Sequence, residues 1–245
     1  MKILKKTTAM KNKFIIGALA LLLGAGAVQA QDFARPKFGI KAGWNNSNIT
    51  NGREGNLDDS KRLNSFNVGV VGVIPLGSTF EIRTGLDLQS KGTESSTSLV
   101  DGVKSTYKVN PLYLELPVNF AVMLPFNEKV KAYIGAGPYA ALGIAGKLKT
   151  TIKTDGTTTT SSESIKWGND NPLDGDDRNG TVGSGQFKRF DFGANIIGGV
   201  DFGRFGVHAQ YGIGLTNTAP GGSNENNANK NNQHRVLGVS GVFYF

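Results

Sequence analysis

Apolar and polar side chains alternate with a period of two residues along much of the chain. In the clearest stretch, one face would carry Phe80, Ile82, Thr84, Leu86 and Leu88, and the other Glu81, Arg83, Asp87, Gln89 and Lys91. A β-strand points successive side chains to opposite faces, so this pattern predicts a strand with one apolar and one charged face. Long windows with the 3.6-residue period of amphipathic helices are missing, and the sequence therefore predicts an all-β fold.

The alternation predicts eight strands. They fall near residues 37–46, 64–74, 79–91, 107–123, 129–146, 187–201, 204–216 and 234–245. The joints after the second, fourth and sixth strands are tight turns, whereas the other four joints are long and polar. Soluble sandwiches do not segregate connections in this way, but an outer-membrane barrel does, with short periplasmic turns and long extracellular loops. We therefore expect a transmembrane antiparallel up-and-down β-barrel.

Some details of this barrel stay open. Pro111, Pro117 and Pro138 fall in predicted strands, where a missing N–H interrupts the ladder, so bulges or shifted strand ends are expected. The Thr-rich stretch over residues 147–161 would give a ten-stranded barrel if it formed an extra hairpin above the membrane. The strand over residues 129–146 has two faces of similar polarity, so its lipid-facing side is not assigned.

The chain ends in a strand with a terminal aromatic residue. One face of this strand would carry Leu237, Val239, Gly241, Phe243 and Phe245. This alternation resembles the C-terminal strand by which bacterial outer-membrane proteins are recognised for insertion. We therefore interpret Phe243 and Phe245 as an insertion signal for the barrel-insertion machinery.

Residues 1–30 are predicted to be a cleaved signal peptide. Five lysines precede an uncharged stretch over residues 14–28, and small residues then favour cleavage between Ala30 and Gln31. A membrane anchor is the alternative, but the uncharged stretch is shorter than the ~20 residues that a spanning helix needs. Residues 31–245 are then expected to form a single barrel domain.

Removal of this segment changes the charge balance. The whole chain has 27 basic and 19 acidic side chains, and loss of the five lysines leaves 22 basic against 19 acidic, a net charge of +3. No basic stripe is interleaved with aromatic residues, so nucleic acid is not expected as a partner. The chain has no Cys, which excludes disulfides, thiolate metal sites and a lipid-modified N-terminal Cys.

Four motifs carry a resemblance to a known family. They lie at residues 38–49 (FGIKAGWNNSNI), 114–118 (LELPV), 136–139 (AGPY) and 189–193 (RFDFG). Together they resemble the PorT-like outer-membrane β-barrel proteins of Bacteroidetes, and the resemblance implies a Gram-negative cell outer membrane as the location. One branch of that family is tied to a secretion machine and others are called porin-like, and the motifs do not choose between them.

Charged side chains are predicted to line the lumen. They are Lys41, Glu81, Arg83, Asp87, Glu115, Arg189 and Asp191, accompanied by Asn119, His208 and Gln210. The interior of an eight-stranded barrel is only wide enough to be filled by side chains, and charges held there must pair. The first interpretation is a salt-bridge network that plugs the barrel. The alternative is a narrow gated pathway for ions or small solutes.

No catalytic, cofactor-binding or metal site is expected. Only His208 and His234 offer a histidine base beside a nucleophile, and we interpret His208 as a hydrogen-bonded lumen residue and His234 as solvent-exposed. The stretch over residues 169–180 (NDNPLDGDDRNG) is rich in oxygen ligands for Ca²⁺, but it lacks the spacing and closing Glu of an EF-hand. The stretch over residues 216–233 is of low complexity and has almost no apolar surface to bury.

The expected function is a structural or interaction role for a closed barrel that presents extracellular loops. A small porin-like channel is the alternative, and an outer-membrane enzyme comes third. The expected partners are outer-membrane lipid and lipopolysaccharide, the barrel-insertion machinery, and an envelope protein that the loops contact.

Overall fold

The computed structural model describes residues 35–50, 61–100, 103–127, 129–154, 156–168, 186–218 and 232–245. The predicted signal peptide, with its cleavage site at Ala30 and Gln31, lies outside these ranges. So do the Asp- and Asn-rich stretch over residues 169–180 and most of the Asn-rich stretch that precedes the last strand. Among the residues described, no helix is long and apolar enough to cross a membrane.

Twelve strands lie within the described ranges. They are β1 (Lys37–Thr50), β2 (Lys61–Leu76), β3 (Phe80–Ser90), β4 (Thr93–Val100), β5 (Val103–Pro125), β6 (Val130–Thr154), β7 (Thr157–Ser164), β8 (Lys166–Gly168), β9 (Gln186–Lys188), β10 (Phe190–Phe202), β11 (Phe205–Gly214) and β12 (Gln233–Tyr244).

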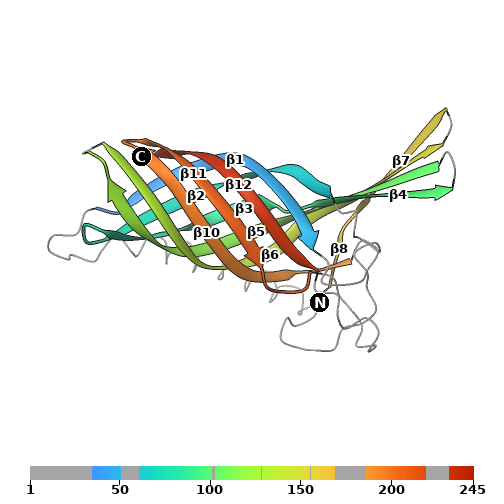
Figure 1. Ribbon diagram of the computed structural model, residues 1–245. Helices are drawn as coiled ribbons and strands as arrows, with labels where there is room; N and C mark the ends of the chain where they lie inside the picture. The colour runs from blue at the N-terminus through green and yellow to red at the C-terminus, as the bar shows by residue number, and fades with distance from the viewer. Residues whose placement is uncertain are drawn as a thin grey trace, which may run out of the picture.

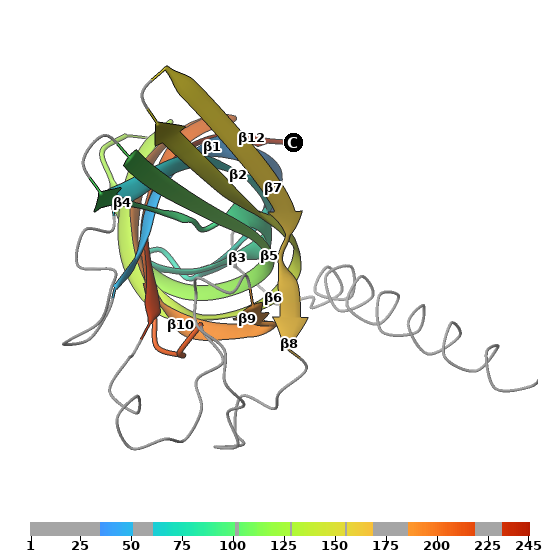
Figure 2. The same cartoon turned by 90° about the vertical axis from the view of Figure 1, so that its right-hand side faces the viewer.

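Eight of these strands close a ring in the order β1, β2, β3, β5, β6, β10, β11 and β12 (Figures 1 and 2). All neighbours in the ring are antiparallel. The ring closes where β12 pairs with β1, from Gly39 opposite Tyr244 to Thr50 opposite Gln233. The predicted all-β, eight-stranded antiparallel barrel is therefore confirmed.

Three tight turns lie at one end of the barrel, which we call the turn end; the opposite end is the loop end. Gly77 and Gly203 have positive φ angles of 83° and 63° in two of these turns, a conformation that favours glycine. In the third turn the Asn127 side-chain oxygen accepts hydrogen bonds from the backbone N–H groups of Lys129 and Val130. The three predicted short connections thus all lie at the turn end of the barrel.

Part of the fold extends beyond the ring at the loop end. The outer halves of β5 and β6 continue to pair with each other, up to Lys104 opposite Lys153, while β4 flanks β5 and β7 flanks β6. We call these four strand segments the outer sheet; Figure 1 shows β4 and β7 projecting from the barrel. The Thr-rich stretch does form a hairpin, but β7 pairs with β6 alone among the described strands, so the ten-stranded alternative is wrong.

One of the three prolines that fall in predicted strands lies beside a shift in strand register. The β5–β6 ladder shifts between Leu112 and Tyr113, next to Pro111, and leaves Ile144 without a partner in that ladder. The shift inverts the faces of β6: Tyr133 and Tyr139 point inward before it and Leu148 points inward after it. The two faces of β6 look alike in the sequence for another reason: over residues 132–140, before the shift, the inward face carries only Tyr and Gly and the outward face mainly Ala.

The outward face of the ring is apolar and exposed. The exposed side chains of this face are Phe38, Ile40, Trp44, Phe66, Val68, Val70, Leu116, Val118, Phe120, Ile134, Leu142, Ile144, Phe192, Ile196, Val207, Leu237 and Val239. An apolar surface this continuous is far larger than soluble monomers expose. It is the lipid-facing band expected of a membrane barrel.

Aromatic side chains mark the turn end of this band. Phe80 stacks on Phe120 with ring centroids 5.3 Å apart, and Phe243 packs between Phe205 and Phe245 at 5.2 and 5.9 Å. Outer-membrane barrels carry such girdles of aromatic residues at the interfaces. The two residues interpreted as an insertion signal, Phe243 and Phe245, thus belong to the lipid-facing girdle.

Candidate functional site

The alternation of β3 determines which charges enter the lumen. Glu81, Arg83, Asp87 and Gln89 all point inward and are at most 4% exposed, while the residues of opposite parity, such as Ile82 and Leu86, point outward. Charges withdrawn from water are costly unless they are paired and hydrogen-bonded. The partners come from strands around the ring and form three groups along the barrel axis.

The first group surrounds Arg83 near the turn end. Its guanidinium donates to the carboxylates of Glu81 and Asp201, and to the Tyr244 hydroxyl at 3.1 Å. Tyr244 in turn donates to Asp201 at 3.0 Å. The guanidinium also lies 3.2 Å from the centroid of the Tyr133 ring, an arrangement that favours a cation. One cation thus links β3, β10, β12 and β6.

The second group is a single ion pair. The Lys41 ammonium lies 2.7 Å from the Asp87 carboxylate, and the two side chains are 6% and 0% exposed. This pair crosses from β1 to β3, which are separated by β2 in the ring. It therefore connects strands that share no backbone hydrogen bonds.

The third group surrounds Lys91, just beyond the end of β3. Its ammonium lies 2.7 Å from Glu115 and 3.1 Å from Asp191, and it is 4.2 Å from the centroid of the Tyr139 ring. The hydroxyl of Tyr139 donates to Asp191 at 3.0 Å. The remaining bonds to the two carboxylates come from Asn195, Gln210 and Thr216.

Neutral side chains connect β1, β2, β3 and β12 across the lumen. The amide of Asn45 donates to Gln89 at 2.7 Å, and that of Asn67 donates to Asn45 at 2.7 Å. Ser240 donates to Asn67 at 2.6 Å. Because buried amides are costly without partners, this chain of bonds fixes the side chains that fill the lumen.

Six of the seven predicted lumen charges are buried in the groups described above: Lys41, Glu81, Arg83, Asp87, Glu115 and Asp191. The seventh, Arg189, is half-buried at the bend between β9 and β10 and forms no ion pair with any residue that the structure describes. Lys91 instead occupies the position between the two carboxylates. Period-two alternation places Lys91 on the polar face of its strand, but the predicted network contains neither Lys91 nor Asp201 and Tyr244.

The side chains around Lys41 and Arg83 leave a small space between them. A cavity of about 20 Å³ is lined by Lys41, Arg83, His208 and their neighbours. A cavity needs about 10–15 Å³ to hold one water molecule, so this one accommodates little more than a single water.

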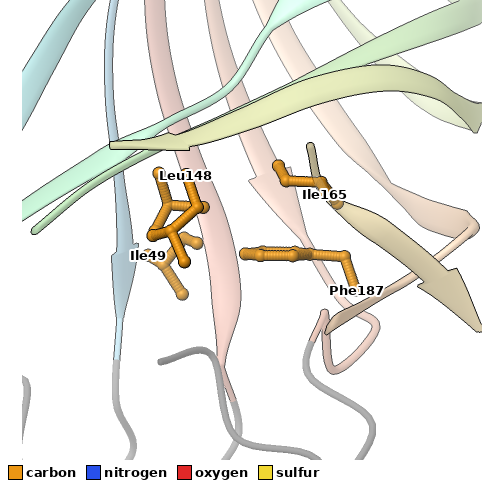
Figure 3. Packing of buried hydrophobic residues seen from close by; sticks show 5 residues of the cluster. Ile49, Leu148, Ile165 and Phe187 are labelled. Atoms are coloured by element: carbon orange, nitrogen blue, oxygen red, sulfur yellow. The ribbon is translucent and has the colours of Figure 1, made fainter. Parts of the chain in front are cut away.

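An apolar cluster covers the loop end of the lumen, and we call it the cap. Its buried members are Ile49, Val109, Leu148, Ile165 and Phe187 (Figure 3). Trp167 packs against these residues. Ile165 and Trp167 lie in and beside β8, which pairs in parallel with β9, the strand that holds Phe187. The sequence pattern predicts a long polar loop for this connection, and the cap is not among the predicted features.

The two histidines occupy different environments. The His208 ring Nδ1 is 2.7 Å from the Tyr133 hydroxyl, in agreement with its interpretation as a hydrogen-bonded lumen residue. The interpretation of His234 as solvent-exposed is wrong: it is 0% exposed and packs edge-on against Tyr113, with ring centroids 5.4 Å apart. The alternation of β12 directs it inward, beneath the cap. Within the described part of the chain, no three His, Asp or Glu side chains form a group suited to a metal ion.

Comparison with known proteins gives a family and distant structural likenesses. Residues 29–219 match the family model described as "Outer membrane protein beta-barrel domain". A comparison with curated proteins finds no match. Among solved structures the chain is similar to Ail, the attachment invasion locus protein of Yersinia pestis, with 12% identity, a TM-score of 0.38, and coverage of 86% of this chain and 100% of that one.

Two further solved structures are similar at the same level. The Ail protein in complex with the heparin analogue sucrose octasulfate gives 12% identity and a TM-score of 0.39, with coverage of 86% and 100%. Neisserial surface protein A gives 10% identity and a TM-score of 0.37, with coverage of 85% of this chain and 97% of that one.

Proposed function

The chain belongs to the outer membrane protein beta-barrel domain family, and from this premise we propose that it is a closed, non-enzymatic barrel with a structural or interaction role in the envelope. The turn end faces the periplasm and the outer sheet faces the exterior. The closed lumen is the observation that carries the proposal.

Two barriers in series support a closed lumen. The three charged groups span the barrel from Arg83 to Lys91, and the cap covers the loop end above them. The cavity of about 20 Å³ beside Lys41, Arg83 and His208 is too small for a hydrated ion. This favours a plugged barrel over the porin-like alternative.

Conductance in a planar lipid bilayer tests the closed lumen. The purified protein is expected to produce no steady conductance steps above the baseline of protein-free bilayers. Reproducible steps of one size, carried by the folded protein, would overturn the plug and favour the porin-like channel.

The outer sheet supports the interaction role. All eight residues of β7 are exposed, and β7 pairs only with β6 among the described strands, so its second edge presents free backbone N–H and C=O groups. A free strand edge can accept a strand from another protein. We propose that this edge contacts an envelope protein.

Photo-crosslinking in intact cells tests this contact. A crosslinking residue at Thr160 on β7 is expected to capture one discrete envelope protein, whereas one at Val118 on the lipid-facing band captures none. The absence of a specific product at Thr160 in folded, surface-exposed protein would refute the interaction at β7.

The non-enzymatic part of the proposal depends on the histidine environments. His208 is bonded to Tyr133, and Ser240, which lies opposite His208 on β12, donates its proton to Asn67. The Ser240 hydroxyl therefore points to Asn67 and not to His208, so these two facing residues do not form a nucleophile–base pair. Phospholipid or peptide hydrolysis by the wild type but not by a His234→Ala variant would revive the enzymatic alternative.

We further propose that cleavage between Ala30 and Gln31 removes residues 1–30, and that the insertion machinery recognises Phe243 and Phe245. The PorT-like resemblance of the four motifs to Bacteroidetes proteins supports the same export route. N-terminal sequencing of the protein recovered from outer membranes tests the cleavage: the expected first residue is Gln31, and an intact Met1 would contradict it.

A further inference from the structure

Five lysines gather on one face of the outer sheet. In the β5–β6 ladder Lys104 lies opposite Lys153, and Lys108 lies opposite Lys149. Lys147 precedes Lys149 by two residues and therefore lies on the same face of the sheet. All five side chains are exposed. Like charges directly opposite each other on neighbouring strands destabilise a sheet. The sheet therefore carries this arrangement, which we call the lysine face, at a cost to its own stability.

Little in the described structure neutralises the lysine face. Glu94 on β4 forms an ion pair with Lys108 at 2.8 Å, but the two side chains are 23% and 46% exposed, and such surface pairs contribute little. The acidic residue of β7, Glu163, lies opposite Leu148, which points inward, so Glu163 belongs to the other face. The lysine face is consequently a strong local positive charge.

This face continues the lipid-facing side of the barrel. On β5, Lys108 shares the outward parity of Leu116 and Val118; on β6, the register shift at Ile144 brings Lys147 to the outward side. Lys147 is three residues beyond Ile144, which corresponds to about 10 Å along a strand. The lysines nearest the barrel thus lie just above the apolar band, at the level where lipid headgroups begin.

A groove of about 610 Å³ lies at this boundary. Its apolar lining includes Phe66, Leu112 and Ile144 from the outward faces of three strands. Its polar lining includes Ser90, Asn110, Lys147 and Ser164, and its far side reaches Ile165 and Trp167 of the cap. The groove therefore joins a surface suited to an acyl chain with a surface suited to an anion.

We propose that the lysine face and this groove bind a phosphate-bearing lipid of the surrounding outer leaflet. The phosphate is held by Lys108, Lys147 and Lys149, and an acyl chain of the same lipid lies against Phe66 and Ile144. This binding goes beyond the interaction role proposed above and requires no protein partner, so a failed crosslink at β7 leaves it unaffected.

Binding of lipid A in neutral detergent micelles tests the proposal. The probe is fluorescently labelled lipid A with its phosphates intact, compared with the same lipid after phosphatase treatment. The test variant is Lys108→Gln/Lys147→Gln/Lys149→Gln. The matched control is Lys37→Gln/Lys129→Gln/Arg204→Gln, which removes three exposed cations from the turn end. Heat-dependent gel migration verifies that each variant is folded.

The wild type is expected to bind the phosphorylated lipid, and the test variant to bind it about 100-fold more weakly, because each lysine near an anionic lipid surface contributes about a fivefold factor. The control variant and a Lys→Arg triple variant at the same three test positions bind within about threefold of the wild type. Phe66→Ala weakens binding without changing the charge.

Three results would overturn the proposal. Equal binding of the phosphatase-treated lipid would show that phosphate is not recognised, and equal binding by the test variant would show that these lysines are not the site. Displacement of the lipid by a soluble sulfated polysaccharide, at equal concentration of charge, would assign the lysine face to a soluble polyanion instead of a lipid.

Discussion

The ammonium group of Lys91 joins three strands that are not all neighbours in the ring. It follows β3 in the chain and contacts Glu115 on β5 and Asp191 on β10. Its side chain is 2% exposed and forms an ion pair with both carboxylates, so its removal would leave each of them without this partner. Breaking a buried ion pair by removal of one partner leaves an uncompensated charge, which is far more costly than loss of a surface pair.

Substitution of Lys91 by Met is expected to lower the free energy of unfolding by about 3–5 kcal/mol. The measurement is a urea titration of the barrel in lipid vesicles, followed by tryptophan fluorescence. Lys129→Met, at an exposed position in the turn end, is the control and is expected to change stability by less than about 0.5 kcal/mol. Equal stability of the two variants would show that Lys91 does not balance the two carboxylates.

The sequence predicted which faces the charged residues occupy but not which residues pair. Period-two alternation places Asp191 on the lumen side, and Arg189 has the same parity two residues earlier. The actual partner, Lys91, lies 100 residues away in the chain. Pairing across the lumen depends on the stagger of strands around the ring, which hydrophobic pattern alone does not specify. His234 differs, because the alternation of β12 already indicated its inward position.

Within the cap, the strand β8 fits against a glycine of β6. A Cβ added at Gly143 would overlap the ring of Trp167. Gly143 therefore allows the Trp167 ring to lie directly against β6, where it also packs edge-on against Tyr113 with ring centroids 5.4 Å apart. A larger residue here must displace the β8 segment or strain the barrel wall.

Gly143→Ala, made in a Trp44→Phe background, is expected to red-shift the fluorescence of Trp167 and to lower the free energy of unfolding by about 1–3 kcal/mol. The shift follows from displacement of the indole into water. Gly241→Ala is the control, because nothing lies within 4 Å of a Cβ added there. An unchanged emission maximum in Gly143→Ala would contradict the close packing of Trp167 on β6.

The outer sheet should be separable from the ring. Leu148 and Glu163 already lie opposite each other on β6 and β7, so residues 149–162 can be replaced by a two-residue Asn-Gly turn. The shortened protein is expected to keep the heat-dependent gel migration of a closed barrel and to lose no more than about 1 kcal/mol of stability, because an exposed hairpin is only marginally stable by itself. Loss of the closed form would mean that β7 contributes to the barrel wall.

For the individual secondary-structure elements, the sequence was informative for long regular strands and uninformative for short irregular ones. The eight ring strands and the three tight turns followed from alternation and turn residues. The cap did not, because Ile165, Trp167 and Phe187 are isolated apolar residues in connections that otherwise read as polar. Three-residue strands such as β8 and β9 are too short to show a period.

The apolar band of the whole molecule predicts how deep each residue lies in the bilayer. Ile196 is midway along β10 and 50% exposed, and Ile152 lies in the outer sheet and is 39% exposed. Ile196→Arg is expected to cost about 2–4 kcal/mol in lipid vesicles, whereas Ile152→Arg costs about 0–1 kcal/mol. Urea titration in vesicles measures both. Equal costs would mean that the exposed band does not face lipid.

The pairing of β1 with β12 determines when this barrel can be completed. The seam joins residues near the two ends of the described chain, and the backbone N–H of Phe245 donates to the carbonyl of Phe38 at 2.9 Å. In each of the other ring pairs, the two strands are consecutive ring strands along the chain. Until the last strand arrives, β1 and the growing edge carry unpaired backbone groups, which hydrocarbon cannot satisfy. A chain that lacks residues 233–245 is thus an open sheet, and its two edges, on β1 and β11, have no partner strand in the ring.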